Sequence, residues 1–483
     1  MTSISLFIHG QSTAASSGAT FERRSPLDGT LATTAPAATV QDAIAAVEAA
    51  AAAFPAWSAT GPGKRRALLT KAAHALEAKA PAFIAAMVAE TGASALWAGF
   101  NVHMAAGTLL EAASLTTQIN GEVIPSDVPG NLSMGVRQAA GVVLGMAPWN
   151  APVILGVRAI AVPLACGNTV VLKGSELCPA THSLIIEALQ EAGLPPGVVN
   201  FITNAPADAA AVVEAMVAHP AVRRVNFTGS THVGKIIASV CAKYLKPVLL
   251  ELGGKAPLLV LDDADLEAAV SATAFGAFAN SGQICMSTER IIVDASVADA
   301  FVSLLAAKAA SLPLGDPRQG PVVLGSVVDM ATVYRCNALI DDALEKGATL
   351  LCGGKADSTL MPATLLDHVT PAMHIYSDES FGPVKGIVRV NGVDEAVACA
   401  NDNAYGLSSA VFGRDIARAL QVAGRIQSGI CHINGPTVHD EPQMPFGGVK
   451  GSGIGSFGGR AGIEAFTDLR WITVQTTPRH YPF

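Results

Sequence analysis

The sequence predicts an α/β protein with parallel sheets, and two observations lead to this prediction. Beyond residue 140, short apolar runs rich in β-branched residues alternate with helix-like stretches. Strands that alternate with helices are typical of βαβ units and a mostly parallel sheet. Residues 40–120 are expected to be helical, because Ala and Glu dominate there and apolar positions recur at helical spacing. A chain of 483 residues has room for two large domains or about three ordinary ones.

The alternating region divides into two parts. In the first part, strands are predicted at 141–145, 168–173, 198–202 and 225–227, with helices at 181–192 and 208–218. A strand at 247–252 then ends in the Gly253-Gly254 turn, and the alternation restarts with a strand at 257–261, a helix at 266–280 and a strand at 290–293. We therefore place one domain boundary near 254. A second falls near 430, before a glycine-rich stretch and an apolar tail at 471–474.

Composition excludes several classes of protein. Only 14% of the residues are charged and 50% are hydrophobic, against about 25% charged residues in an average protein, so a large core or a subunit interface is expected. Low-complexity disorder is excluded, because it requires few hydrophobic residues and many charges. The net charge of −8, without a long Lys or Arg run, argues against a nucleic-acid partner.

Neither a membrane span nor a secretion signal is predicted. The longest charge-free apolar stretch, 141–157, is interrupted by two prolines, whereas a spanning helix needs about 20 uninterrupted residues. The eight cysteines form no CxxC pair, which is typical of reduced thiols, so we expect a cytoplasmic protein. No metal is expected either: the eleven histidines include no HExxH motif, and His432 and His439 beside Asp440 have no further ligand spacing.

A candidate phosphate-binding turn runs from Gly229 to Lys235. It follows a strand and is expected to open a helix at 236–244, so free N–H groups and the helix dipole would suit a phosphate. The spacing nearly matches a P-loop, but Ile236 stands where Ser or Thr must bind magnesium. A dinucleotide pyrophosphate is therefore favoured over ATP, with an ordinary strand-to-helix turn as the alternative.

Lys173 and Glu176 form a second candidate site. They follow a predicted parallel strand, and charged groups at the carboxyl end of such a strand face the ligand crevice. Glu176 would accept hydrogen bonds from ribose hydroxyls and would repel a 2′-phosphate. The alternative is a solvated pair of loop residues.

Three further residues have side chains suited to chemistry. Cys285 lies in a connection between a helix and a strand, flanked by small and polar residues. Glu251 is a carboxylate beside two glycines, and Asn150 is an amide between two prolines that could stabilise an oxyanion. Each also has an ordinary structural explanation: an inert buried thiol, an ion-paired surface Glu and a turn Asn.

The order and spacing of these motifs resemble the NAD(P)-dependent aldehyde dehydrogenase superfamily over about residues 5–475. Glu251 lies 34 residues before Cys285, as in the family pattern. One position departs from that pattern, because Gly174 stands where the family usually has Pro, and we expect it to loosen the turn. The six matching motifs are PWN at 148–150, GNTVVLK-x-SE at 167–176, FTGS-x-x-x-G at 227–234, ELGGK at 251–255, GQIC at 282–285 and ESFGP at 379–383.

The resemblance implies a role for each matching residue. Cys285 would be the nucleophile, Glu251 the general base and Asn150 the oxyanion-binding amide. NAD would be the cofactor. Its binding residues would be Trp149 in the cleft, Lys173 and Glu176 at the adenosine ribose, Gly229 and Ser230 at the pyrophosphate, Leu252, Glu379 at the nicotinamide ribose and Phe381 near the nicotinamide ring.

The implied reaction is oxidation of an aldehyde to a carboxylic acid. The Cys285 thiolate adds to the carbonyl, hydride leaves to the nicotinamide, and Glu251 activates the water that hydrolyses the thioester. A CoA-acylating relative is a rival, but that branch generally lacks the Glu of ELGGK. A nucleotide-binding protein without catalysis is the remote alternative.

The sequence is also similar to bacterial aromatic aldehyde dehydrogenases, around 120–138 and 151–158. This similarity implies an aromatic aldehyde substrate, with salicylaldehyde favoured and vanillin, benzaldehyde or a broad range of aldehydes as alternatives. A small residue at Ala151 would leave room for a ring, and Arg158 would meet a ring hydroxyl. The other expected wall residues are Trp97, Ile284, Met286 and His439, each of which also has a simple packing explanation.

The resemblance implies a domain arrangement and an assembly. We expect a Rossmann-like NAD-binding domain formed by 1–119 and 141–253, and a catalytic domain at 254–430. Segments 120–140 and 465–483 would form a small β oligomerisation segment, as in a homodimer or homotetramer. Residues 431–464 are expected to be a glycine-rich loop region between the catalytic and cofactor domains.

Overall fold

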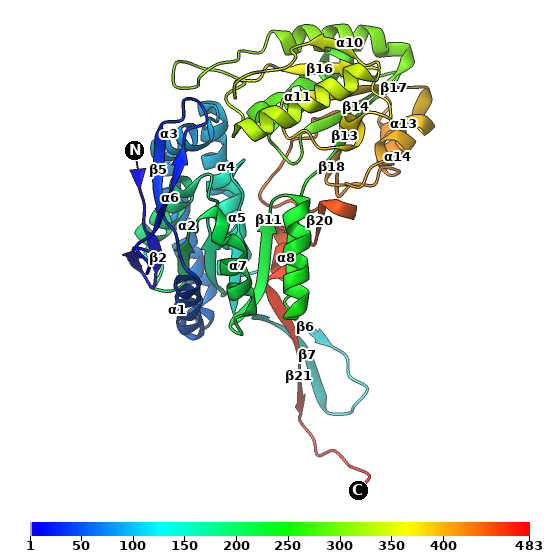
Figure 1. The fold of residues 1–483 in the computed structure, drawn as a ribbon. Helices are drawn as coiled ribbons and strands as arrows, with labels where there is room; N and C mark the ends of the chain where they lie inside the picture. Colours follow the sequence, from blue (N-terminus) through cyan, green and yellow to red (C-terminus); the bar gives the residue numbers. More distant parts are fainter. Residues whose placement is uncertain (1) are drawn as a thin grey trace.

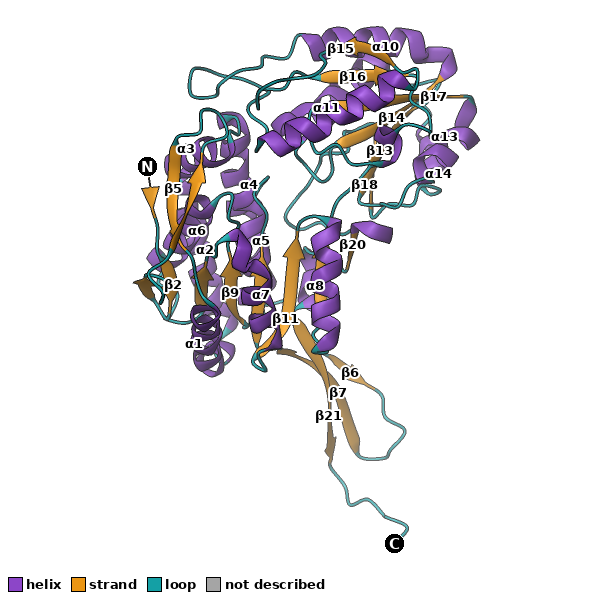
Figure 2. Ribbon diagram, in the orientation of Figure 1, coloured by secondary structure: helices purple, strands orange, loops and turns teal. Residues whose placement is uncertain are grey.

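The computed structural model describes residues 2–483 and contains two α/β bodies and a projecting β arm (Figure 1). Two large sheets form the centres of the bodies, and helices cover them (Figure 2). This arrangement confirms the predicted α/β class with mostly parallel sheets. None of the helices within residues 2–483 combines the length and the apolar character that crossing a membrane requires.

The first body is built on an eight-stranded sheet in the order β20-β12-β11-β8-β9-β10-β2-β3. The five strands from β12 to β10 are parallel, and the edge strands β20, β2 and β3 are antiparallel to their neighbours. A separate three-stranded sheet contains β1 (Thr2–Ser3), β4 (Thr20–Arg24) and β5 (Leu31–Pro36). The large sheet comprises β2 (Leu6–Ile8), β3 (Gln11–Thr13), β8 (Val142–Met146), β9 (Thr169–Lys173), β10 (Val199–Ile202), β11 (Val222–Thr228), β12 (Val248–Glu251) and β20 (Gly453–Ile454).

Helices cover the first sheet, and the helical part predicted at 40–120 is confirmed as four helices. The most deeply placed is α5, all of whose residues are buried. The first begins at a capping box, in which the Thr39 side chain accepts from the Asp42 N–H and Asp42 accepts from the Thr39 N–H. The helices are α1 (Val40–Ser58), α2 (Pro62–Ala78), α3 (Ala80–Thr91), α4 (Ala95–Leu115), α5 (Pro152–Ala165), α6 (Pro179–Glu191), α7 (Ala209–Ala218) and α8 (Thr231–Lys243).

One helix boundary was predicted wrongly. Helix α8 begins at Thr231, five residues before the expected start, because the Ser230 side chain caps it by accepting from the Val233 N–H at 3.3 Å. Gly234 belongs to its first turns, where a Cβ would lie 2.4 Å from the Leu252 side chain. The glycine in this motif therefore permits packing of helix on strand.

The second body contains a seven-stranded sheet in the order β15-β16-β17-β14-β13-β18-β19, parallel except at the β15 edge. Its strands are β13 (Ala256–Val260), β14 (Thr288–Asp294), β15 (Thr349–Cys352), β16 (Thr364–Asp367), β17 (Val384–Val390), β18 (Ser408–Phe412) and β19 (Ile430–Ile433). Its helices are α9 (Leu266–Phe278), α10 (Ala295–Ala310), α11 (Met330–Glu345), α12 (His374–Ser377), α13 (Gly392–Asn401) and α14 (Ile416–Ala423).

The glycine-rich segment at 431–464 is more regular than predicted. It begins within β19, contains β20 and includes most of α15 (Gly459–Ala465). Strand β20 pairs with β12, so the segment reaches back to the first sheet. A Cβ at Gly453 would lie 2.2 Å from the Leu250 carbonyl oxygen, so the glycine there permits close approach of two strands.

The arm is a three-stranded antiparallel sheet in the order β21-β7-β6, which projects from the first body (Figure 1). Its strands are β6 (Glu122–Ile124), β7 (Asn131–Ala139) and β21 (Thr467–Gln475). Large apolar side chains stand exposed on it, with Trp471 at 75% and Val123 at 72% of their full exposure. The arm therefore presents an apolar surface to solvent in the isolated chain.

Candidate active site

The carboxyl ends of four adjacent parallel strands, β12, β11, β8 and β9, bring the predicted cofactor residues together. The chain runs from β8 to β9 and β10 on one side and then returns to β11 on the other, so its direction across the sheet reverses between β8 and β11. Ligands of open α/β sheets bind at such a switch point. The predicted residues that end or follow these four strands are Trp149, Asn150, Lys173, Glu176, Gly229, Ser230, Glu251 and Leu252.

Lys173 and Glu176 form an ion pair beside the end of β9. Asn204, which follows β10, donates to Glu176 Oε1 at 3.1 Å, while the Asn204 Oδ1 atom is buried and has no partner within residues 2–483. An acceptor left without a donor next to an ion pair suits a ligand that carries hydroxyl groups.

Gly174 does not leave the turn after β9 loose, as we had expected. The Gly174 N–H donates to the Ile202 carbonyl at 2.9 Å, and the Ser175 N–H donates to His182 Nδ1 at 3.0 Å. Burial lowers the pKa of His182 to about 3, so its ring is neutral and can accept this bond. A Cβ at Gly174 would lie 2.8 Å from the Phe201 ring, which explains the glycine sterically.

Cys285 follows a strained turn that comes directly after α9. Asn280 and Ser281 both adopt left-handed backbone angles, with φ of 49° and 54°; such strain clusters at functional sites. A Cβ at Gly254 would lie only 2.4 Å from the Cys285 carbonyl oxygen. The glycine therefore lets the Cys285 loop approach the end of the first sheet. Cys285 itself is partly exposed and lines a cavity.

Asn150 is fixed against the Cys285 loop. Its Nδ2 donates to the Gln283 carbonyl at 3.0 Å, and its own carbonyl accepts from Trp97 Nε1 at 2.9 Å and from Asn280 Nδ2 at 3.0 Å. An Asn amide nitrogen has two hydrogens, so one remains for a ligand in the cavity that Asn150 and Cys285 both line.

Glu251 is buried, at 2% exposure, and neither carboxyl oxygen has a hydrogen-bond partner within residues 2–483. Burial raises the pKa of Glu251 well above its usual value, against the opposing effect of Arg158. Burial, with the charges of Glu251 and Glu379, raises the pKa of Cys285 to about 12. Without cofactor or substrate, the pair therefore consists of a protonated thiol and a carboxyl group that favours its neutral form.

Glu379 and Phe381 reach the same region from the second body. Glu379 Oε1 accepts from the Gly254 N–H at 2.9 Å, and a Cβ at Gly253 would meet Glu379 Oε2 at 2.6 Å. Burial raises the pKa of Glu379 to about 7. Phe381 meets Trp149 edge to face, with ring centroids 5.7 Å apart. These contacts connect the second body to the carboxyl edge of the first sheet.

A cavity of about 690 Å³ with mostly apolar walls lies over Cys285. Arg158 and Asp440 form a buried ion pair in its wall, and the Arg158 guanidinium lies 4.4 Å from the centre of the Phe446 ring. All six predicted wall residues line the cavity: Trp97, Ala151, Arg158, Ile284, Met286 and His439.

Sequence reasoning missed several residues of the site. Asp440 was noted only as a neighbour of two histidines, and its contact with Arg158 spans 282 residues of chain. Phe100 and Phe275 also line the cavity, and they look like ordinary helix residues in the sequence. Asn280 and Gln283 form hydrogen bonds with Asn150. Their position as polar residues in the segment that carries Cys285 was the only sequence feature that could have predicted this role.

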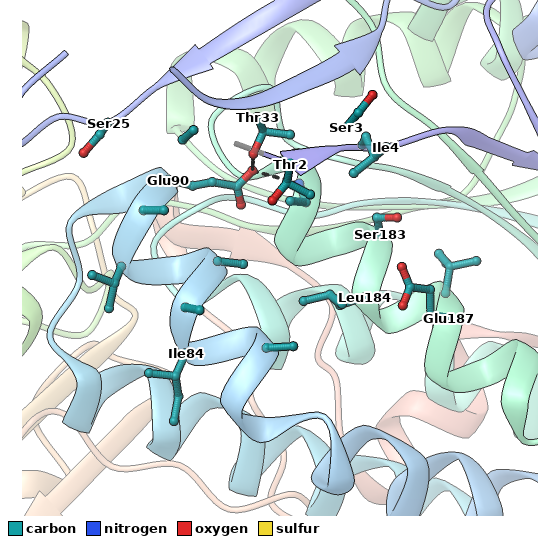
Figure 3. A pocket seen from close by; sticks show the side chains of 18 of the residues that line it. Thr2, Ser3, Ile4, Ser25, Thr33, Ile84, Glu90, Ser183, Leu184 and Glu187 are labelled. Carbon is teal, nitrogen blue, oxygen red and sulfur yellow. Dashed lines mark hydrogen bonds between the residues drawn. The ribbon is translucent and has the colours of Figure 1, made fainter. Parts of the chain in front are cut away.

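A second cavity, of about 950 Å³, lies between β5, α3 and α6 (Figure 3). It contains none of the predicted site residues. Its buried charge, Glu90, accepts four hydrogen bonds, from Ala180 N–H, the Thr33 hydroxyl and both the N–H and hydroxyl of Thr181, at 2.7–3.0 Å. This carboxylate is fully engaged in capping α6, so the cavity over Cys285 is the better candidate for the active site.

The chain is similar to known proteins over its whole length. Residues 13–472 match the aldehyde dehydrogenase family. A vanillin dehydrogenase of Pseudomonas fluorescens is 63% identical over 482 residues, covering 100% of both chains. A salicylaldehyde dehydrogenase of Pseudomonas putida is 52% identical over 479 residues, covering 99% of both. The crystal structure of a salicylaldehyde dehydrogenase from Pseudomonas putida G7 complexed with salicylaldehyde superimposes with a TM-score of 0.98, at 51% identity and with 100% of both chains covered.

Proposed function

Because the chain belongs to the aldehyde dehydrogenase family, we propose that it oxidises a hydroxylated aromatic aldehyde to its acid with NAD, using Cys285, Glu251 and Asn150. One observation supports this assignment most strongly. A cysteine and an amide with a spare N–H line the same apolar cavity. A carboxyl group without hydrogen-bond partners lies nearby and acts electrostatically on that cysteine.

The Cys285 sulfur forms a bond to the aldehyde carbon, and its proton must leave first. The pKa of the thiol is raised to about 12, so its proton passes to water in the cavity that Cys285 lines before the thiolate attacks. The free Nδ2 hydrogen of Asn150 and the Cys285 N–H stabilise the negative oxygen that results.

The carboxyl edge of the first sheet fits a dinucleotide. Lys173, Glu176 and the unpartnered Asn204 oxygen suit ribose hydroxyls, Ser230 caps the first turn of α8, and Glu379 projects beside Gly253 and Gly254. Bound NAD would supply the hydride acceptor that turns the tetrahedral adduct into a thioester. Glu251 then removes a proton from water, which attacks the thioester, and as the acid leaves this proton passes from Glu251 to the Cys285 sulfur.

The cavity supports an aromatic substrate. Ala151 is small, Trp97 and Phe100 stack with centroids 5.4 Å apart, and the remaining wall is largely aliphatic. The Arg158–Asp440 pair supplies a donor and an acceptor for a ring hydroxyl in this apolar setting. Salicylaldehyde is our first candidate. Vanillin is the second, favoured by the 63% identity to a vanillin dehydrogenase over the whole chain.

A substrate panel tests the proposal. The ratio kcat/KM is measured for salicylaldehyde, vanillin, benzaldehyde and hexanal, each with NAD and with NADP. We expect hydroxylated benzaldehydes with NAD to give the highest values, because Glu176 repels a 2′-phosphate. A preference for hexanal would refute the aromatic assignment, and equal efficiency with NADP would refute the role of Glu176. Consumption of CoA during turnover would instead support an acylating reaction.

The same assignment gives each part of the fold a role. Residues 1–119 and 141–253 bind the cofactor, 254–430 carry the nucleophile, and 431–464 line the interface between them. The arm at 120–140 and 465–483 joins subunits into a homodimer or homotetramer, which would cover its exposed apolar side chains.

A further inference from the structure

Three ionisable side chains lie fully buried at the start of three adjacent strands of the second sheet. Lys255 precedes β13, Glu289 is the second residue of β14, and Lys385 is the second residue of β17. The three strands are neighbours in the sheet of the second body (Figure 1). Their side chains are between 0% and 2% exposed. We call these residues the Glu289 cluster. Burying charged groups is costly unless they are paired and hydrogen-bonded, so these three side chains depend on one another and on the polar groups around them.

Glu289 holds the two lysines together. Lys255 Nζ lies 2.9 Å from Glu289 Oε2, and Lys385 contacts Glu289 Oε1. The register between β13 and β14 slips at this point, so that Glu289 is the extra residue of an irregularity in β14. Although burial opposes ionisation, Lys255 and Lys385 hold the pKa of Glu289 down at about 2.

The cluster forms hydrogen bonds with the main chain on both sides of Glu379. Lys255 Nζ donates to the Asp378 carbonyl at 2.7 Å. Glu289 accepts from the Ser380 N–H at 2.9 Å and from the Ser380 hydroxyl at 2.7 Å, and Lys385 Nζ donates to that hydroxyl oxygen at 3.2 Å. The peptide groups before and after Glu379 are therefore both tied to one buried set of charges.

The segment held in this way is strained and carries the two residues that face the first sheet. Phe381 has a φ of 43°, in the left-handed region that a bulky side chain rarely adopts. With Ser380 anchored, Glu379 is directed to the Gly254 N–H and Phe381 to the Trp149 ring. A strained conformation persists only where surrounding contacts determine it fully.

We propose that the Glu289 cluster positions Glu379 and Phe381 for cofactor binding, so that Glu289, Lys385 and Ser380 act on the cofactor without touching it. This inference rests on the proposed function, in which Glu379 binds the nicotinamide ribose. In this inference, Lys255 of the ELGGK motif stabilises the second sheet through Glu289 and the Asp378 carbonyl. Changes in the cluster would therefore alter cofactor affinity without altering the chemistry of Cys285.

Two variants test the inference, each measured by the dissociation constant for NAD and by hydrolysis of p-nitrophenyl acetate without cofactor. Ser380→Ala removes one hydroxyl. The double variant Glu289→Leu/Lys385→Met removes one charge of each sign and keeps the net charge of the cluster. We expect the dissociation constant for NAD to rise at least fivefold in both variants, with ester hydrolysis within twofold of the wild type, because the ester reaction needs only Cys285, Asn150 and Glu251.

The control is Arg389→Gln, which removes the ion pairs of Arg389 with Asp367 and Asp299 near the opposite end of β17. This variant should leave NAD affinity unchanged. Any of three results would overturn the inference. These are unchanged NAD affinity in Ser380→Ala, a loss of ester hydrolysis as large as the loss of NAD affinity, and an equal rise in the dissociation constant for NAD in the control. The variant Glu379→Gln separates the two proposals: if it binds NAD normally, the assigned role of Glu379 fails, whereas weak binding there with normal binding in the cluster variants rejects only the inference.

Discussion

At the scale of single residues, Glu251 is an acid group in an unusual state. A carboxyl group buried without hydrogen-bond partners is costly, and structures retain such groups at sites where the group must exchange protons. Asn150 illustrates the opposite arrangement, because three hydrogen bonds hold it in one orientation. In the proposed mechanism, the site would thus combine a rigid donor for the oxyanion with a carboxyl group that no hydrogen bond restrains.

Replacing Glu251 with Gln should separate the two halves of the reaction. Hydride transfer to NAD is expected to remain, giving a burst of NADH of about one equivalent per active site. The following steady state should fall by a factor of about 10²–10⁴, the typical contribution of a general base. Rapid-quench measurement of the burst with mass spectrometry of acylated Cys285 checks this outcome. A full-rate steady state would refute the role of Glu251 as the base.

Asp440 should contribute to the pH dependence of the enzyme, although burial is the main cause of the raised pKa of Cys285 and of Glu251. Its charge raises the pKa of both Cys285 and Glu251, whereas Arg158 lowers both. Asp440→Asn removes the raising effect, so the acidic limb of the profile of kcat/KM should move to lower pH, by roughly a few tenths of a unit to one unit. The control is Glu441→Gln, an exposed acid of the same loop paired with His439, which should leave the profile in place. A shift to higher pH in Asp440→Asn would contradict the prediction.

At the scale of elements, the sequence predicted what local patterns determine and missed what tertiary contacts determine. The five parallel strands of the first sheet were predicted because β-branched runs between glycines are a local signal, whereas the short edge strands β2, β3 and β20 were not predicted. The start of α8 was not, because Thr231 and Val233 are poor helix formers and the helix is fixed instead by the Ser230 cap and by Gly234 against Leu252. The partners of Arg158 and Lys173 differ in the same way: Glu176 is three residues from Lys173, whereas Asp440 is 282 residues from Arg158.

The turn after β9 gives a prediction at this scale. Pro is usual in the family at the position of Gly174, but here Gly174→Pro would remove the N–H that donates to Ile202 and place a Cβ against Phe201. We expect a loss of about 1–3 kcal/mol of unfolding free energy, the cost of an unsatisfied buried group, together with weaker NAD binding through displacement of Lys173 and Glu176. Denaturant unfolding and NAD titration measure both effects. The control Gly63→Ala, at an open position in α2, should be neutral or stabilising, and a fully stable Gly174→Pro would show that the turn is not constrained as described.

At the scale of the whole molecule, the proposed function depends on two separate sheets that meet at one site. The first sheet supplies Asn150, Glu251 and the cofactor edge, while the second supplies Cys285, Glu379 and Phe381. Glycines at 253 and 254 make the approach possible, because Glu379 and the Cys285 carbonyl occupy the space that their side chains would need. The family resemblance could be read from the motifs, but the reason for these two glycines becomes evident only when both sheets are in place.

The arm gives the prediction that concerns the whole assembly. Its apolar side chains, among them Trp471 and Val123, are exposed in the isolated chain, and burying such area contributes about 25 cal/mol per Å². If the arm joins subunits as proposed, the double variant Val123→Asp/Trp471→Asp should shift the protein from the proposed dimer or tetramer to a smaller species, because charged groups would have to be desolvated in the interface. Sedimentation velocity at several concentrations measures this change. Tyr334→Asp, at an exposed site on α11 away from the arm, is the control and should assemble normally. If the arm variant keeps the wild-type assembly, the subunits must associate through another surface.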